Sequence, residues 1–266
     1  MQPLFFGKPD KPLFGIYHPP LTRADRGTGV VLCSTFGSEY LNSHRALRQF
    51  AVRLSRVGFH ALRFDYYGSG DSGGNSDEGD VDQWKKDISF AIEELKNRAG
   101  LSNVSLVGLR VGATLATMVA GERNDVESLM LWEPVLNTRG YIEELGIQHR
   151  DWLGEQLFSE LNLSHQKDGG VEIIGFPLTN RFRLGLESID LLSLERCAAK
   201  HVLIVRSSNG AKDQSFVGRL EELGASPNYM EIATQNRWLQ REGIDQVVVP
   251  NEVLDAMILW MTEIHV

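Results

Sequence analysis

The sequence predicts an α/β fold in which a mostly parallel central sheet is flanked by helices. Two patterns indicate it. Short β-branched runs alternate with amphipathic helices along most of the 266 residues. Several runs, such as Val202–Val205, are continuously apolar, as expected for strands buried on both faces. The length suits a single domain over residues 1–266.

The strands are predicted where short apolar or β-branched runs end at turn signals. In chain order they are Leu13–His18, Val30–Ser34, His60–Asp65, Asn103–Val107, Ser128–Glu133, Val202–Arg206 and Tyr229–Ala233.

Three helices between the strands are well marked. The apolar face of the first consists of Leu47, Phe50, Ala51, Leu54 and Val57. Gly58 follows this helix as a stop signal. The second helix starts at Asp80, with Gln83 at capping-box spacing, and the third starts at Asn251 after Pro250.

The alternation breaks over about residues 137–190, where the chain is partly helical. We expect a helical lid here, over the carboxyl ends of the strands, where open α/β sheets bind ligands. An ordinary surface excursion is the alternative. The lid is favoured because its apolar side chains need something to pack against, namely Trp152, Leu153, Leu157, Phe158 and Leu161.

Composition excludes several classes of protein. Hydrophobic residues make up 42% and charged residues 23%, which excludes a disordered chain. The net charge of −8 and the pI of about 5.4 make nucleic acid a poor partner. Residues 1–10 lack a basic segment followed by an apolar stretch, and no run is long enough to span a membrane. With only two cysteines, we expect a cytoplasmic protein. No His, Cys and carboxylate cluster has metal spacing, so no metal or cofactor is predicted.

The segment Gly108–Gly112 lies between an apolar strand and a helix that begins with small residues. This is the setting of the Gly-x-Ser-x-Gly elbow, whose glycines permit a sharp turn from strand to helix. Here the nucleophile position holds Arg110. An arginine remains protonated and cannot attack a carbonyl.

These motifs resemble an α/β-hydrolase of the serine-aminopeptidase-like branch, close to exosortase-associated hydrolases and to hydrolase-like proteins of natural-product clusters. An arginine at the elbow also looks like a feature of that branch. The resemblance implies an α/β-hydrolase fold and accessory roles in polysaccharide or natural-product synthesis, where thioesters on carrier proteins are common. It covers nearly the whole chain, and the matching segments are Phe36–Tyr40, Ser43–Leu47, Gly58–Ser72, Gly108–Gly112 and Leu131–Val135.

A hydrolase of this fold needs a nucleophile, an acid after a late strand and a histidine after the last strand. Asp213 can supply the acid. The loop Thr234–Gln240 contains no histidine, and His265 is expected in solvent at the end of the last helix. Two members of the triad are therefore missing, and no serine would be activated in the ordinary way.

The anion-binding half of such a site is still predicted. The N–H of Val111 lies at a helix N-terminus and can converge with an N–H of Thr35 or Phe36. Arg110 on the same helix end is unfavourable without a negative neighbour, which we expect to be a substrate carboxylate or phosphate, or Glu39, or both in turn. The alternative is a buried ion pair of Arg110 with Glu39 or Glu133 that only replaces the lost serine.

Further candidates follow from position along the chain. His44 is the candidate proton carrier, with a capping role as the alternative. Cys33 and Ser34 are additional nucleophile candidates, although no neighbouring histidine activates them. We expect Glu39 and Glu133 to orient Arg110. The expected substrate-binding residues are Thr35, Phe36, Val111, Glu133 and Trp238.

Three polar residues have structural interpretations. Asp71 is expected to brace backbone N–H groups in a tight turn. His60 is expected as a satisfied histidine in a strand, and His165 on the surface of the lid.

We expect a protein that acts on or binds an acyl ester or thioester in a biosynthetic pathway, as a non-standard hydrolase or acyltransferase. A pseudo-hydrolase that binds an acyl ligand or carrier protein is the alternative, and an interaction scaffold with a filled pocket is a third possibility. The expected substrate is a small acyl molecule, carried in some cases on a carrier protein, and the expected state is a monomer or homodimer.

Overall fold

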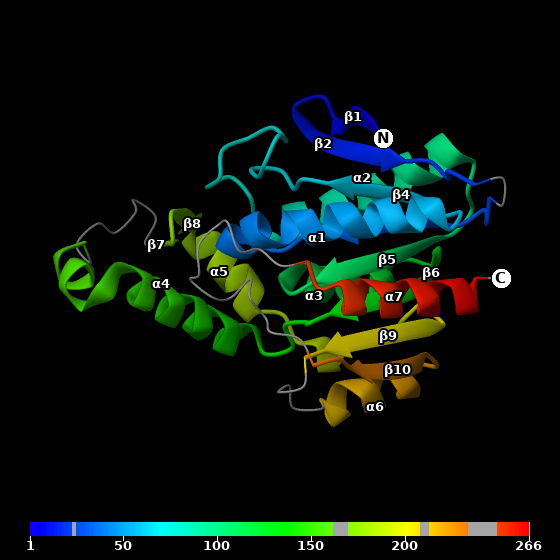
Figure 1. The fold of residues 1–266 in the computed structure, drawn as a ribbon. Coiled ribbons are helices and arrows are strands. Elements are labelled where there is room, and N and C mark those ends of the chain that lie inside the picture. The colour runs from blue at the N-terminus through cyan, green and yellow to red at the C-terminus, as the bar shows by residue number, and fades with distance from the viewer. Residues whose placement is uncertain (23–24, 162–169, 208–212, 234–248, 266) are drawn as a thin grey trace.

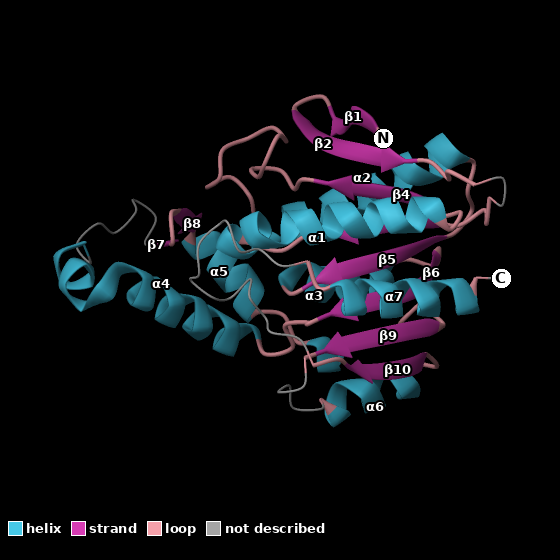
Figure 2. Ribbon diagram, viewed as in Figure 1, coloured by secondary structure: helices cyan, strands magenta, loops and turns pink. Residues whose placement is uncertain are grey.

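A central eight-stranded sheet organises the protein (Figures 1 and 2). The computed structural model describes residues 1–22, 25–161, 170–207, 213–233 and 249–265. The order β1-β2-β4-β3-β5-β6-β9-β10 is parallel from β4 onward, whereas β1 and β2 pair antiparallel. The strands are β1 (Gln2–Lys8), β2 (Lys11–His18), β3 (Gly29–Cys33), β4 (His60–Phe64), β5 (Val104–Leu109), β6 (Val126–Trp132), β9 (His201–Arg206) and β10 (Ser226–Glu231).

Helices cover both faces of the sheet, each with its own apolar core. One face packs against α1 (Gly37–Arg56) and α7 (Asn251–Ile264), which Figure 1 shows side by side. The other packs against α2 (Val81–Ala99), α3 (Val111–Glu122) and α6 (Gln214–Glu222). The central strands are buried on both faces, which explains their continuous apolar sequence.

The predicted α/β architecture is confirmed, and each predicted strand matches an observed one within a few residues. The predicted helix start at Asp80 is also confirmed, because Asp80 Oδ1 accepts a 2.8 Å hydrogen bond from the Gln83 N–H. The Gln83 side chain contacts Lys11 and Asp87 instead of the Asp80 N–H, so only this half of the capping box forms. Gly58, with φ of 98°, follows the end of α1 as expected. Strand β1 was not predicted, because only Phe6 of that strand is buried and its sequence has no clear apolar pattern.

The insertion between β6 and β9 is only partly helical. It contains α4 (Thr138–Leu161), which is kinked at Gly154, the hairpin of β7 (Val171–Ile173) and β8 (Phe176–Leu178), α5 (Asn180–Glu187) and the turn η1 (Leu191–Ser193). Figure 1 shows α4 extending away from the sheet. Trp152 is 46% exposed, so the expectation that it packs beneath a lid is wrong for this side chain. The side chains of Leu157, Phe158 and Leu161 lie outside the described part.

The parallel strands bring distant segments to one edge of the sheet. The carboxyl ends of β3, β5, β6 and β9 meet there because these strands are neighbours. Ser34, Arg110, Glu133 and Ser207 each follow one of these strands directly. This edge is where ligands bind in open α/β sheets.

Candidate functional site

Arg110 occupies a sharp turn between β5 and α3. Its backbone has φ of 53° and ψ of −121°, a conformation that side chains other than glycine rarely adopt. Its N–H donates to the Trp132 carbonyl over 3.0 Å, and its own carbonyl accepts from the Ala113 N–H over 3.0 Å. The predicted elbow geometry is therefore present around an arginine.

The two glycines of the elbow are required by close packing. A Cβ at Gly112 would lie 2.1 Å from the Ser34 carbonyl oxygen, and one at Gly108 would lie 2.3 Å from the Ala113 Cα. Only glycine fits at such distances. The elbow thus presses directly against the segment that follows β3, as an oxyanion-type arrangement requires.

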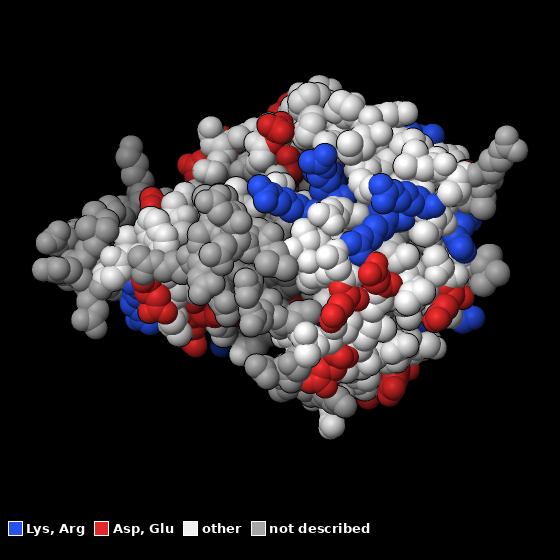
Figure 3. Space-filling view, viewed as in Figure 1, with Lys and Arg blue, Asp and Glu red and all other residues white. Residues whose placement is uncertain are grey.

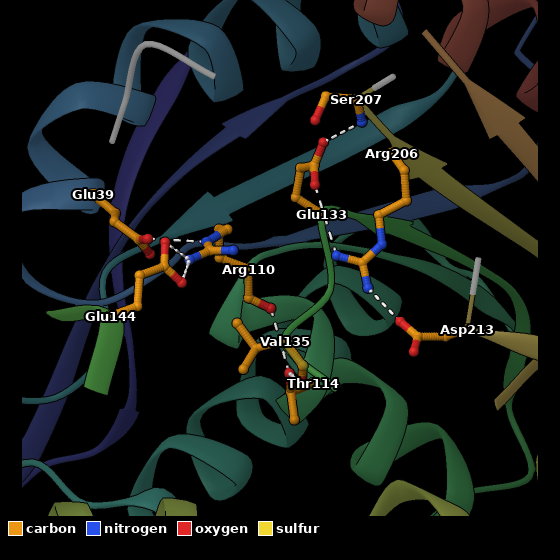
Figure 4. A network of polar contacts seen from close by, with 9 residues as sticks. All are labelled: Glu39, Arg110, Thr114, Glu133, Val135, Glu144, Arg206, Ser207 and Asp213. Atoms are coloured by element: carbon orange, nitrogen blue, oxygen red, sulfur yellow. Dashed lines mark hydrogen bonds and ion pairs between the residues drawn. The ribbon is translucent and has the colours of Figure 1, made fainter. Parts of the chain in front are cut away.

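Two carboxylates hold the Arg110 guanidinium (Figure 4). Its Nε donates to Glu39 Oε1 over 2.9 Å, and its Nη2 donates to Glu144 Oε2 over 2.9 Å. The guanidinium also lies 5.1 Å from the centre of the Tyr141 ring. Burial lowers the pKa of Arg110, but the charges of Glu39 and Glu144 outweigh it and hold the pKa above its ordinary value.

Glu39 is the buried anchor of this cluster, with a relative exposure of 1%. Its second oxygen, Oε2, accepts from the Thr35 hydroxyl at 2.7 Å and from the Tyr141 hydroxyl at 3.0 Å. Burial raises the pKa of Glu39, and the charge of Arg110 opposes that rise. Both carboxylate oxygens accept hydrogen bonds and the side chain is almost completely buried, so Glu39 is shielded from a ligand.

Glu133 belongs to a separate network. Its carboxylate accepts from the Ser207 N–H and lies 3.7 Å from Arg206 Nη1. Arg206 Nη2 in turn donates to Asp213 Oδ2 over 3.0 Å (Figure 4). Of the two ion pairs considered for Arg110, the contact with Glu39 is therefore confirmed. The expected contact with Glu133 is wrong, because Glu133 follows β6 and turns toward β9.

The acid candidate, Asp213, is paired with Arg206 rather than with a histidine. Arg206 is close to both Glu133 and Asp213 and serves as their shared cation. The structure thus divides the predicted site into an Arg110 cluster and an Arg206 cluster.

Among the described residues, no hydrogen bond or ion pair joins the side chains of the other nucleophile and proton-carrier candidates to Arg110. His44 is exposed on α1, and its Nδ1 lies 2.8 Å from the Leu41 carbonyl. Burial raises the pKa of the Cys33 thiol to about 12, so it is a structural thiol at neutral pH. Ser34 is buried, and its hydroxyl has no hydrogen-bond partner among the described residues.

The expected substrate-binding residues differ in their surroundings. Phe36 is buried and stacks on Phe182 of α5, with ring centres 5.1 Å apart. Thr35 donates to Glu39, and Val111 opens α3. Trp238, and His165 of the predicted lid, lie outside the described residues.

Two structural expectations about polar residues are wrong. His265 is buried rather than solvent-exposed, because its Nε2 contacts the Ser105 and Ser128 hydroxyls at 3.1 Å. The tight turn is braced by Asp65, which accepts from the N–H of Asp71, and not by the Asp71 carboxylate. The expectation for His60 is confirmed, since its ring bridges Tyr17 and Asp25.

Sequence reasoning missed Tyr141 and Glu144. Both lie on α4, three residues apart, and so share one helix face. The spacing indicates that the two side chains share a helix face, but nothing in the sequence shows that this face turns toward Arg110. Within the described ranges no group of three His, Cys, Asp or Glu side chains could hold a metal, and no helix could cross a membrane.

A family model described as serine aminopeptidase, S33, matches residues 30–172, which include the oxyanion segment and the elbow. The chain belongs to this family. The resemblance read from the motifs is confirmed at that level. Arg110 therefore replaces the elbow serine within a recognisable member of the S33 family.

Part of the chain is also similar to two curated proteins. The mitochondrial palmitoyl-protein thioesterase ABHD10 of Homo sapiens and that of Pongo abelii are each 33% identical over 92 residues. The match covers 34% of this chain and only 28% of each relative.

Solved structures resemble the whole chain at low identity. Est1E of Butyrivibrio proteoclasticus with bound ferulic acid has a TM-score of 0.70 at 17% identity, covering 98% of both chains. A proline iminopeptidase of Mycobacterium smegmatis has a TM-score of 0.65 at 11% identity, covering 99% of this chain and 98% of that one. The fold is therefore the α/β-hydrolase fold.

Proposed function

We propose that this protein binds an acyl ester or thioester at the carboxyl edge of the sheet without forming an acyl-enzyme at the elbow. The observation that carries the proposal is that Arg110 occupies the nucleophile position of the elbow and that its guanidinium contacts two carboxylates. An arginine has no lone pair with which to attack a carbonyl. The sequence of the loop after β10 also lacks the histidine that would activate another nucleophile.

The elements that would hold an acyl group remain in place. Val111 is the first residue of α3, so its N–H has no intrahelical acceptor and carries part of the positive end of the helix dipole. The close approach of Gly112 to Ser34 brings the segment Thr35–Phe36 to the same place. A carbonyl oxygen between these N–H groups would be bound as in an oxyanion hole.

The charge balance favours an uncharged carbonyl over a free carboxylate or phosphate. Arg110 is the one cation in direct contact with Glu39 and Glu144 among the described residues, so the cluster has no positive charge left over. A second anion would have to displace Glu144, because Glu39 is almost completely buried, whereas the Glu144 side chain is partly exposed. The lack of surplus positive charge therefore weighs against the anionic ligand expected from sequence.

The class of ligand is supported by similarity. The curated relatives are palmitoyl-protein thioesterases, and Est1E was solved with ferulic acid bound. We propose an acyl group presented as a thioester, on a small molecule or a carrier protein, in a biosynthetic pathway of the kind that the motif resemblance implies. The insertion over residues 137–190 would act as the lid of a single domain, working as a monomer or homodimer.

A non-standard hydrolase or acyltransferase is the second candidate. Family membership favours hydrolysis, and the Glu144 side chain is 38% exposed beside Arg110. A carboxylate in that position can accept a proton from an attacking water or alcohol. Glu39 is poorly placed for this role, because it is almost completely buried and paired with Arg110.

Titration with palmitoyl-N-acetylcysteamine and its thioether analogue tests both candidates. Binding that is saturable and at least about tenfold tighter for the thioester supports carbonyl recognition, since only the thioester offers the carbonyl oxygen. Product formation is followed by chromatography, and acyl adducts are detected by intact mass. We expect no product above the protein-free rate and no acyl adduct on the protein. Absence of binding would overturn the proposal.

The same assay distinguishes the hydrolase or acyltransferase from the binding protein. Turnover that disappears in Glu144→Gln and persists in Glu143→Gln would establish an enzyme with Glu144 as its base. Glu143 is the matched control, because it is an exposed neighbour on the same helix.

A further inference from the structure

A row of arginines lies on the exposed face of α1. Arg45, Arg48 and Arg56 are exposed and recur at helical spacing, so they point to the same side. In Figure 3, Lys and Arg side chains gather over this helix. The whole chain has a net charge of −8, so this local group of positive charges has the opposite sign to the protein as a whole.

The α1 arginine row (Arg45, Arg48 and Arg56) is not neutralised within the described part of the protein. None of the three has an ion pair or hydrogen bond to a described side chain. Arg53, on the same helix, contrasts with them because it pairs with Asp255 of α7 at 2.6 Å. The row therefore offers positive charge to solvent.

Beneath the row lies a second, partly buried cationic group. Arg63 of β4 is half-buried, and its Nε has no hydrogen-bond partner among the described residues. The charge of Arg48 contributes to lowering the pKa of Arg63, after burial, which is the larger cause. His18 of β2 is 2% exposed, and its Nε2 also lacks a described partner.

No carboxylate within the described residues binds this group directly. Asp65 is close enough to raise the pKa of Arg63, but its oxygens accept from the Tyr40 hydroxyl and the Asp71 N–H. Buried polar atoms without partners in the free protein are unusual and call for an explanation. An external anion between Arg48 and Arg63 would supply the missing acceptor.

We propose that the α1 arginine row, with Arg63, is a docking surface for an acidic face of a partner protein. From Arg45 to Arg56 the row extends about 16 Å at 1.5 Å per residue. That length suits several carboxylates on a folded partner better than a single phosphate. Charges of opposite sign at such a surface speed association and fix orientation.

The position of the row connects docking to the candidate site. α1 begins at Gly37, directly after the Thr35–Phe36 segment, and Glu39 lies in its first turn. Leu41, near this end, is 52% exposed and offers an apolar contact beside the arginines. A partner lying along α1 would thus reach the carboxyl edge of the sheet. Delivery of an acyl group there rests on the proposed function, whereas docking itself does not.

A labelled acyl carrier protein bearing a palmitoyl thioester is the probe, titrated against wild type at low salt. We expect the double variant R45E/R48E to bind at least tenfold more weakly. The matched control, K8E/K86E, changes two exposed lysines of β1 and α2 and alters the net charge equally. It is expected to bind as wild type does. Equal losses in both variants, or no loss in R45E/R48E, would overturn the proposal.

Two further experiments distinguish the docking proposal from the proposed function and from binding to a lipid surface. Palmitoyl-N-acetylcysteamine should bind wild type and R45E/R48E equally, because it needs no docking surface. If this small thioester fails to bind while the carrier protein still depends on the row, the proposed function fails and the docking surface stands. Flotation with phosphatidylglycerol vesicles that depends on Arg45 and Arg48, without carrier binding, would overturn the docking proposal in favour of a lipid surface.

Discussion

Arg110 Nε lies 2.9 Å from Glu39 Oε1, and that carboxylate is almost completely buried. The contact joins the elbow to the first turn of α1, two segments far apart in sequence. In a serine hydrolase the elbow residue must remain free to attack the substrate. Here it forms a buried ion pair, and we propose that the elbow contributes to stability rather than to covalent chemistry.

Arg110→Ala should destabilise the fold by about 3–5 kcal/mol, because it leaves the Glu39 carboxylate buried without its cation. Urea unfolding followed by circular dichroism measures the change. In an Arg110→Ala background, Glu39→Gln should recover part of the loss, since it removes the unpaired charge. The control is Arg53→Ala, which breaks a surface pair and should cost less than about 1 kcal/mol. Equal losses of unfolding free energy in Arg110→Ala and Arg53→Ala would show that the buried ion pair stabilises the fold no more than a surface pair does.

Gly112→Ala should destabilise the protein by about 3 kcal/mol or more, because its Cβ would meet the Ser34 carbonyl at 2.1 Å. Gly146→Ala is the matched control within α4, where a Cβ meets nothing within 4 Å. That change should stabilise the protein by about 0.5–1 kcal/mol, as alanine favours a helix. Thermal unfolding of both variants tests the packing of the elbow; a tolerated Gly112→Ala would refute it.

Asp87 should make stability depend on pH. Burial raises its pKa from 3.8 to about 6, although hydrogen bonds from the Tyr67 N–H and Gln83 oppose the rise. The folded state therefore favours the protonated form, so its contribution is full below about pH 4 and is lost as the pH rises through 6. The loss is about 3 kcal/mol at 1.36 kcal/mol per pKa unit. In Asp87→Asn this decline should disappear from urea unfolding measured between pH 4 and 7.

His18 should act in the opposite direction over the same range. Burial, with the charge of Arg63, lowers its pKa from 6.5 to about 4. The folded state favours the neutral ring, so this contribution is present above pH 6.5 and is lost as the pH falls toward 4. His18→Gln should therefore steepen the net decline of stability with rising pH, whereas Asp87→Asn reduces it. Slopes that change in the same direction would contradict both assignments.

Much of the fold could be predicted from sequence, because its signals are local. The apolar run of β9 and the spacing of Asp80 and Gln83 report burial and capping without knowledge of the rest of the chain. Strand β1 could not be predicted in this way, because its exposed side chains give no apolar pattern. His265 was misplaced because the end of a helix looks exposed unless its docking against β5 and β6 is known.

The candidate site was predictable only in part. The elbow, Arg110 and its contact with Glu39 follow from a motif and from charge balance. Glu144 and Tyr141 enter through the packing of the insertion, which no local pattern specifies. The assignment of Glu133 failed for the same reason, since its partner Arg206 lies on another strand.

Fluorophosphonate labelling should fail with wild type and also with Arg110→Ser. The variant restores the elbow serine, but the segment between β10 and α7 contains no histidine to deprotonate it, and His265 is buried against the Ser105 and Ser128 hydroxyls. Intact mass after incubation with the probe gives the readout, with an active serine hydrolase as the positive control. Stoichiometric labelling of Arg110→Ser would show that another side chain acts as the base and would contradict this prediction.

The most direct measurement combines equilibrium binding with intact mass for wild type and palmitoyl-N-acetylcysteamine. A ligand that binds saturably, remains intact and leaves no adduct would agree with an acyl-binding site that has lost its nucleophile. Hydrolysis above the protein-free rate, or a palmitoyl adduct on the protein, would contradict this conclusion, and the mass of a digested adduct would identify the residue responsible.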